Sequence, residues 1–196
     1  YSYGAGGARR ANGAVRAARN RYLAGRFSPL GWLAAKFRHH AALASLQPLR
    51  LPINARILDV GCGGGELLLD LQSAGFTRLL GTDPFVMQDL DLGGGLRVLR
   101  RELQAVEGEF DLVMFHHSLE HVPDPDAVLR AAWQRLAPQG RCIVRIPTVS
   151  SWAWRHYGAD WCALDAPRHL ILHSRKSIEQ LARASGFVVE RISDDA

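Results

Sequence analysis

The sequence has few cysteines, no long apolar run and no secretion signal. Its three cysteines, Cys62, Cys142 and Cys162, are odd in number and lack C-x-x-C spacing, which argues against a disulfide framework. No apolar stretch approaches the roughly 20 residues that span a bilayer, and no signal-peptide pattern opens the chain. With 196 residues, 47% hydrophobic and 22% charged, the composition predicts one soluble, cytoplasmic domain with a sizeable core.

Acidic residues are absent before Asp59, although arginine is frequent there. Such a basic segment can attract nucleic acid, a membrane surface or a phosphorylated substrate, but a GC-rich gene also produces an arginine excess. Helical spacing over residues 8–23 and 29–46 predicts two helices in this segment. We expect residues 1–52 to form a helical lid over the site, or else to close one side of the core that residues 53–196 form.

A glycine turn organises the remainder of the chain. Residues 56–60 are an apolar run typical of a buried parallel strand, Gly-Cys-Gly-Gly-Gly follows, and a helical apolar series begins at Leu67. Glycine lets a ligand approach the backbone closely, and the amides at a helix N-terminus point at that ligand. The alternating strands and helices that follow predict an α/β fold with a doubly wound, mostly parallel sheet.

Three residues distinguish the ligand of this turn from a dinucleotide. The dinucleotide fingerprint needs a third small residue where this chain has Glu66. Asp59 lies two positions before the first glycine, where it would repel a pyrophosphate but attract an ammonium or sulfonium cation. Asp83 ends the next apolar run, residues 79–83, where its carboxylate can accept both hydroxyls of a ribose.

The segments Asp-Val-Gly-Cys-Gly-Gly-Gly (59–65) and Gly-Thr-Asp-Pro (81–84) resemble the first two motifs of class I methyltransferases that use S-adenosylmethionine. The resemblance implies a Rossmann-like sheet and S-adenosylmethionine as the cofactor, with its amino-acid end on the glycine turn and its ribose on the second acid. It also implies an adenine contact after the third strand, where Glu102 can equally be an ordinary exposed loop residue. The cofactor-binding residues predicted in this way are Asp59, Gly61, Cys62, Gly63, Asp83, Pro84, Glu102, Leu103 and His116.

Histidines follow the strand predicted at residues 110–115. They fall beside the cofactor by topology, because ligands of doubly wound sheets bind at the carboxyl ends of strands near the switch in strand order. An oxygen acceptor must lose its proton near neutral pH, and histidine is the usual base. We therefore predict His117 and His169 as candidate bases, with His116 and His121 behind them. Each can instead be a hydrogen-bonded structural histidine.

Two further segments bear on the acceptor. Leu-Glu-His-Val-Pro-Asp-Pro (119–125) resembles small-molecule class I methyltransferases, and the chain lacks the Asn/Asp-Pro-Pro-aromatic motif of enzymes that methylate nucleic-acid bases. Asp-x-Pro-Arg-His-Leu (165–170) resembles a bacterial subfamily found in glycan and secondary-metabolite pathways. The resemblance implies O-methylation of a small-molecule or glycan acceptor. A nucleic-acid methyltransferase and a non-catalytic cofactor-binding protein are the alternatives, and the sequence sets neither the acceptor nor the oligomeric state.

Residues 148–173 are expected to form an insertion on the acceptor side. His169 and His173 fall on a predicted strand and would share one face of it. With Cys162 they make too loose a set for zinc, and no trio of Asp or Asn residues indicates magnesium, so we predict no metal. The aromatic residues of the insertion can form an acceptor pocket, a partner surface or a small core of their own; they are Trp152, Trp154, Tyr157 and Trp161.

The remaining elements are expected as a helix at 126–137, a strand at 141–146 and a strand at 187–192. Between the second acid and a strand at 96–99 only a short helix or a turn fits. The class I sheet ends with a seventh, antiparallel strand, which we expect to lie beyond this chain. Because the chain begins at Tyr1 rather than methionine, we expect it to be a fragment.

Overall fold

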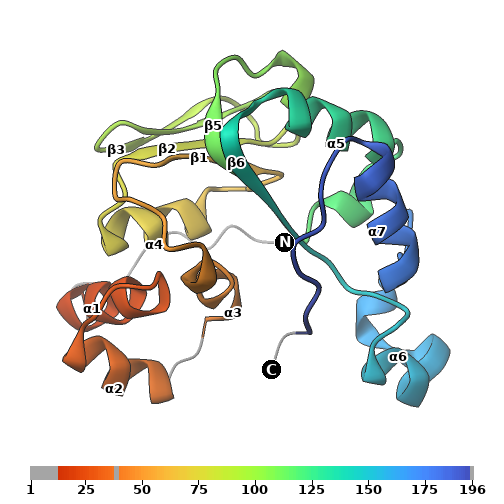
Figure 1. Ribbon diagram of the computed structural model, residues 1–196, viewed down its shortest axis with the longest axis horizontal. Helices are drawn as coiled ribbons and strands as arrows, with labels where there is room; N and C mark the ends of the chain where they lie inside the picture. Colours follow the sequence, from red (N-terminus) through yellow and green to blue (C-terminus); the bar gives the residue numbers. More distant parts are fainter. Residues whose placement is uncertain (1–12, 38–39, 195–196) are drawn as a thin grey trace.

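A six-stranded sheet with helices on both faces forms the centre of the protein (Figure 1). The computed structural model describes residues 13–37 and 40–194. The strand order is β3-β4-β2-β1-β5-β6, and all neighbours run parallel except β3 and β4. The predicted doubly wound, mostly parallel sheet is confirmed. The strands are β1 Arg56–Val60, β2 Arg78–Thr82, β3 Leu90–Gly93, β4 Leu96–Leu99, β5 Phe110–His116 and β6 Leu136–Arg145.

Alternate residues of the central strands pack into two separate apolar cores. Ile57 of β1 lies in the core that contains α4, whereas its neighbour Leu58 lies in the core that contains α5. Both side chains are fully buried, because successive strand residues point to opposite faces and helices cover both. The α-helices are α1 Gly13–Leu23, α2 Pro29–Phe37, α3 Ala41–Ala44, α4 Glu66–Ala74, α5 Pro125–Gln134, α6 Trp152–Tyr157 and α7 Arg175–Ala184.

The N-terminal helices pack on α4, the helix that follows the glycine turn. Asn20 of α1 is fully buried, and its amide donates to Asp70 Oδ1 at 3.0 Å and to Ser73 Oγ at 2.8 Å. The helix expected over 29–46 is instead divided, because α2 ends at Phe37 and α3 is a separate short helix. Residues 8–12 of the first expected helix and residues 38–39 lie outside the described residues. The division of the chain at residue 52 stays a prediction.

The turn expected after Asp83 is present at residues 84–85, and an additional β-hairpin follows it. After the turn that follows Asp83, β3 pairs with β4 in antiparallel orientation. The hairpin closes through three consecutive glycines, Gly93, Gly94 and Gly95, whose φ angles are 83°, 63° and 83°. Side chains other than glycine rarely adopt such angles, so this glycine run makes the reversal possible. The sequence reasoning missed this hairpin because it considered only crossover connections between parallel strands.

Two predicted boundaries near the C-terminal part are also wrong. The helix expected to reach residue 137 ends at Gln134, and β6 begins at Leu136, which pairs with Phe110 ahead of an irregularity in the ladder. Residues 187–192 form no strand, although Glu190 pairs with Arg141 of β6 through its side chain. Residues 170–172 form no strand either; a single bridge between Thr148 and His173 is the pairing found there.

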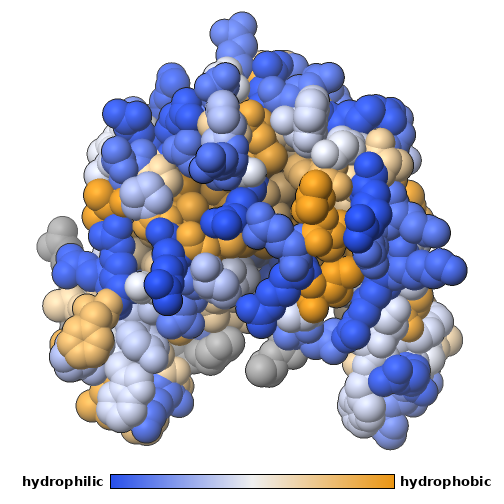
Figure 2. Space-filling model, viewed as in Figure 1, coloured by the Kyte–Doolittle hydropathy of each residue, from blue (hydrophilic) through white to orange (hydrophobic). Residues whose placement is uncertain are grey.

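The helices below the sheet form two lobes in the view of Figure 1. In Figure 1 the chain runs from β6 down to α6, while α1 and α2 lie on the opposite lower side. Figure 2 shows these two parts as separate lobes with a recess between them. Within residues 13–37 and 40–194, the helices are all too short or too polar to traverse a lipid bilayer.

Candidate functional site

The turn that follows β1 needs glycine at its first position, because neighbouring residues leave no room for a side chain there. Gly61 has φ 71°, and a Cβ at this position would lie 2.4 Å from the Cβ of Ser118. Ser118 is held there by its hydroxyl, which donates to the carbonyl of Val60 at 2.6 Å. Gly63 also has a positive φ of 54°, but a Cβ there would meet no described atom within 4 Å. Gly61 is thus needed for packing, whereas Gly63 faces open space that a ligand can fill.

Asp59 is a buried acid beneath this turn. Its side chain is only 2% exposed, and Oδ1 has no hydrogen-bond partner among the described residues. Burial, with a smaller contribution from the nearby charge of Asp83, raises the pKa of Asp59 to about 7. A buried carboxylate without a partner is costly unless a cation offsets it. The site therefore fits a ligand with a positively charged end, as predicted for S-adenosylmethionine.

Asp83 connects the glycine turn to the end of β2. Its Oδ2 accepts a hydrogen bond from the amide of Gly63 and its Oδ1 accepts one from the amide of Phe85, both at 2.8 Å. Each carboxylate oxygen has a second acceptor site, so both remain able to accept a ribose hydroxyl. Pro84 follows on the surface. The structure thus brings together the two predicted motifs, 20 residues apart in sequence.

The thiol of Cys62 packs against the sheet instead of facing the open side of the turn. A Cβ at Gly81 would lie 2.4 Å from the Cys62 Sγ, so the sulfur packs against β2. Burial raises the pKa of this thiol, and the charges of Asp59 and Asp83 raise it further. A thiol with a raised pKa is a poor nucleophile, which argues against covalent chemistry at Cys62.

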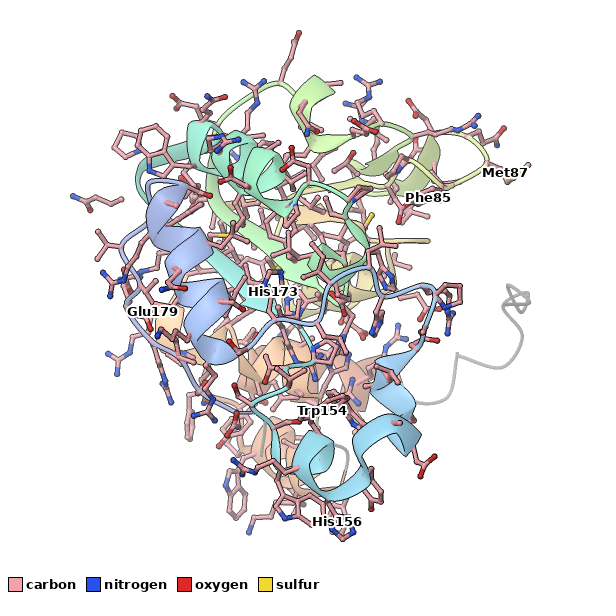
Figure 3. All side chains as sticks on the ribbon, turned by 90° about the vertical axis from the view of Figure 1, so that its right-hand side faces the viewer. Phe85, Met87, Trp154, His156, His173 and Glu179 are labelled. Atoms are coloured by element: carbon pink, nitrogen blue, oxygen red, sulfur yellow. The ribbon has the colours of Figure 1, made fainter. Side chains whose placement is uncertain are left out.

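The loop after β4 gives its two predicted residues different environments. Glu102 is exposed and precedes the turn η2 (Leu103–Ala105), while Leu103 is 2% exposed and packs in the core beside α5. Phe85 and Met87 lie after β2 and are 87% and 88% exposed. Figure 3 shows both projecting from one edge of the molecule. A flat apolar group can rest against such side chains, whereas Glu102 offers a polar contact.

His116 and His117 lie at the carboxyl end of β5. His117 has a positive φ of 52° and its amide donates to the carbonyl of Arg145 at 2.9 Å. The ring of His117 lies between two charged groups: Nε2 is 2.6 Å from a guanidinium nitrogen of Arg145, and Nδ1 is 3.5 Å from a carboxylate oxygen of Glu120. Because arginine only donates hydrogen bonds, Nε2 accepts and Nδ1 carries the proton.

Glu120 is a site residue that the sequence reasoning did not assign. It lies in η3 (Leu119–His121), is 1% exposed, and neither carboxylate oxygen has a hydrogen-bond partner among the described residues. Its backbone carbonyl accepts hydrogen bonds from the amides of Leu170 and Ile171. The sequence signal was an acid directly after a buried strand and between histidines.

His169 reaches the same acid from the insertion. Its Nε2 lies 3.9 Å from Glu120 Oε1 and 3.8 Å from Asp165 Oδ2, and its side chain is 8% exposed. His173, expected on the same strand face, lies instead in the interior (Figure 3) with its Nδ1 3.3 Å from Ser177 Oγ. Burial lowers the pKa of His173, against a smaller raising effect of Glu120. The two predicted bases, His117 and His169, therefore share one buried carboxylate.

The aromatic residues of the insertion form small contacts among themselves and leave much surface exposed. Trp154 and Trp161 meet edge to face with ring centroids 6.2 Å apart, and Trp152 stacks on His156 at 4.6 Å. Trp152 is nevertheless 63% exposed. The group is thus partly a local core and partly an exposed surface of the lobe that contains α6.

Two relatives in sequence have the same name, ubiquinone biosynthesis O-methyltransferase. A ubiquinone biosynthesis O-methyltransferase of Xanthomonas axonopodis pv. citri is 33% identical in an alignment of 147 residues that covers 64% of this chain and 61% of that protein. One of Escherichia coli is 30% identical in an alignment of 169 residues that covers 76% of this chain and 70% of that protein. This chain thus spans about three fifths of the length of the Xanthomonas relative.

Solved structures share the fold at lower identity. A methyltransferase of Thermotoga maritima described as a possible histamine N-methyltransferase has a TM-score of 0.59 and 21% identity, over 81% of this chain and 75% of that one. The magnesium protoporphyrin IX methyltransferase of Synechocystis PCC 6803 with bound S-adenosylhomocysteine has a TM-score of 0.56 and 18% identity, over 96% and 82%. A family model described as a methyltransferase domain matches residues 33–192. This chain therefore belongs to the methyltransferase domain family, a group of class I methyltransferases that use S-adenosylmethionine.

Proposed function

We propose that this chain transfers the methyl group of S-adenosylmethionine to a hydroxyl oxygen of a small molecule, a glycan being one acceptor class. The main observation in support of this proposal is that His117 lies at the carboxyl end of β5, between Arg145 and the buried Glu120. The names of the relatives support an oxygen acceptor. The cytoplasm stays the predicted compartment.

The residues of the turn would position the methyl donor. S-adenosylmethionine, when bound, supplies a methyl group on a sulfonium centre that is already activated. Asp59 offers an unpaired carboxylate oxygen to the cationic end of the cofactor, and Asp83, fixed by the amides of Gly63 and Phe85, offers acceptors to the ribose. Holding both ends supplies orientation, which can account for about 7–11 kcal/mol of the barrier in well-aligned reactions.

His117 would accept the hydroxyl proton of the acceptor. In this structure the lone pair of Nε2 accepts a hydrogen bond from Arg145, so the guanidinium would have to turn toward the acceptor oxygen before Nε2 takes the proton. The Nδ1–H of His117 points at Glu120, whose carboxylate would stabilise the imidazolium that forms. Arg145, beside the same Nε2, would face the oxygen as negative charge develops on it. His169 is the second candidate base, but its nearly buried ring makes it less accessible to an acceptor than the half-exposed ring of His117.

The test begins with calorimetric titration of the chain with S-adenosylmethionine, with NADH as the control ligand. Methyl transfer is then measured on a panel of phenols, catechols and glycans for the unaltered chain, for His117→Ala and for His156→Ala, an exposed histidine at the far end of the insertion (Figure 3). We expect His117→Ala to lower turnover at least about 100-fold with unchanged cofactor affinity, and His156→Ala to remain active.

Two results would count against the proposal. Saturable cofactor binding without turnover on any hydroxylated acceptor would favour a non-catalytic binding protein. Methylation of nucleic acid, with binding that weakens steeply as salt rises, would favour the nucleic-acid alternative.

A further inference from the structure

Three donor side chains converge between β5 and the end of the insertion. Glu120 and His121 come from η3, and His169 comes from the segment that returns after the aromatic residues. One ligand atom from each lies within 4.8 Å of the other two. The amide of Leu170 donates to the carbonyl of Glu120 at 2.8 Å and holds the two segments together.

Both imidazole rings are oriented by backbone carbonyls. Nδ1 of His121 lies 2.8 Å from the carbonyl oxygen of Arg168, and Nδ1 of His169 lies 2.8 Å from the carbonyl oxygen of Ala163. A carbonyl oxygen only accepts, so each Nδ1 must carry the hydrogen and each Nε2 keeps its lone pair. Hydrogen bonding of the second ring nitrogen is the arrangement that fixes metal-binding histidines. The two rings meet edge to face with centroids 4.8 Å apart.

The carboxylate of Glu120 lacks what a buried acid ordinarily has. It is 1% exposed, and neither oxygen has a hydrogen-bond partner among the residues that the structure describes. The nearest polar groups are ring nitrogens: Nδ1 of His117 at 3.5 Å and Nε2 of His169 at 3.9 Å. The neighbouring acid Asp165 binds Arg168 at 2.6 Å. An uncompensated buried carboxylate is costly, and a divalent cation between it and the two Nε2 atoms would offset that cost.

We propose that Glu120, His121 and His169 bind one divalent transition-metal ion, with Zn²⁺ the representative, through one carboxylate oxygen and two Nε2 atoms. Bonds of about 2.0–2.1 Å to a tetrahedral ion put its ligand atoms roughly 3.3 Å apart. The Glu120 to His169 separation is 3.9 Å, and the three ligand atoms lie within 4.8 Å of one another, so the side chains would move closer together on binding. Two imidazoles with one carboxylate suit zinc, cobalt or iron better than magnesium or calcium.

This set differs from the one considered in the sequence, where no metal was predicted. Cys162 is exposed and is not among the converging donors, and His173 bonds to Ser177. His169 is the member common to both sets. Three protein ligands leave a coordination position for water or another small ligand. The site does not depend on methyl transfer, so its binding is testable without an acceptor.

The experiment uses the whole chain, freed of affinity tags and stripped with a chelator. Zn²⁺ is titrated in competition with a chromophoric chelator, and Co²⁺ is titrated by its visible absorption. We expect one equivalent of either ion, and an affinity lowered at least about 100-fold in Glu120→Gln and in His169→Ala, since even second-shell losses reach that range. His156→Ala, an exposed histidine outside the cluster, is the matched control and should bind as the unaltered chain does.

Each outcome decides the proposal. Less than one equivalent bound by the unaltered chain, unchanged affinity in Glu120→Gln, or an equal loss in the control would overturn it. Calorimetry with S-adenosylmethionine on every variant shows whether the fold is intact. If both cluster variants also lose the cofactor, their loss of metal affinity can come from misfolding. The proposal is then tested by the metal affinity of His121→Ala and by the visible spectrum of the unaltered chain with Co²⁺. Nitrogen and oxygen ligands of the protein give bands that aqueous Co²⁺ lacks.

Discussion

Affinity for S-adenosylmethionine should rise with pH because Asp59 must be ionised to hold a cation. Burial and the neighbouring Asp83 raise the pKa of Asp59 to about 7 in the free chain. At pH 6 roughly a tenth of the chains carry the ionised carboxylate, and at pH 8 roughly nine tenths do. If the cofactor binds only the ionised form, its dissociation constant should fall about tenfold between these pH values.

The sign follows from the direction of the shift. A raised pKa means that the free, folded chain retains a proton that an exposed aspartate would have lost. A cation beside Asp59 favours the charged form and expels that proton. Calorimetry at pH 6 in two buffers with different ionisation enthalpies should therefore detect release of most of one proton per cofactor bound, and release should vanish near pH 8.

The control is Asp59→Asn, which has nearly the same shape but cannot ionise. The α-amino group of the cofactor itself titrates near pH 8, so the informative quantity is the difference between the two pH profiles. The variant should bind more weakly and lose the rise in affinity between pH 6 and 8. Parallel profiles for the two proteins would refute the assignment of Asp59 to the cationic end of the cofactor.

Three substitutions test other parts of the site and its support. Asp83→Ala removes the acceptor that the amide of Gly63 contacts and should weaken S-adenosylmethionine binding about 100-fold, since charge-assisted hydrogen bonds contribute about 1.5–3 kcal/mol; unchanged affinity in calorimetry would contradict the ribose contact. Gly61→Ala, with its Cβ 2.4 Å from Ser118, should cost about 1–3 kcal/mol of strain and lower the melting temperature. Asn20→Ala removes two hydrogen bonds from a fully buried amide to the partly buried Asp70 and Ser73; at about 0.5–1.5 kcal/mol each, it should lower the free energy of unfolding by about 1–3 kcal/mol, measured in urea, without changing cofactor affinity.

The cofactor half of the site could be predicted from the sequence because its determinants are local. A buried strand, a glycine turn and a helix follow one another within residues 56–74, and Asp83 ends the adjacent parallel strand. In parallel sheets the carboxyl ends of neighbouring strands meet at one edge. Locating the end of each strand in the sequence was therefore enough to predict that Asp59 and Asp83 lie close together.

The other half depends on contacts between distant segments. His169 reaches Glu120 because residues 170 and 171 bond to a carbonyl of η3, and because Thr148 bridges to His173. Neither contact has a periodic pattern, so the segment was mistaken for a strand. The β3 hairpin was missed for a related reason, since its three-glycine turn creates a pairing that no rule for crossover connections anticipates.

Two buried acids at one edge of the sheet indicate how donor and acceptor are separated. Asp59 belongs to β1 and Glu120 follows β5, and these strands are adjacent and parallel. Each acid has at least one oxygen without a hydrogen-bond partner among the described residues, an arrangement that costs folding free energy. Asp59 lies beneath the glycine turn, on the side of the methyl donor, whereas Glu120 faces the histidines on the side of the insertion. Sequences break the rules of stable folding mainly where function requires it, so these two acids mark the two places at which we infer that a positively charged partner binds.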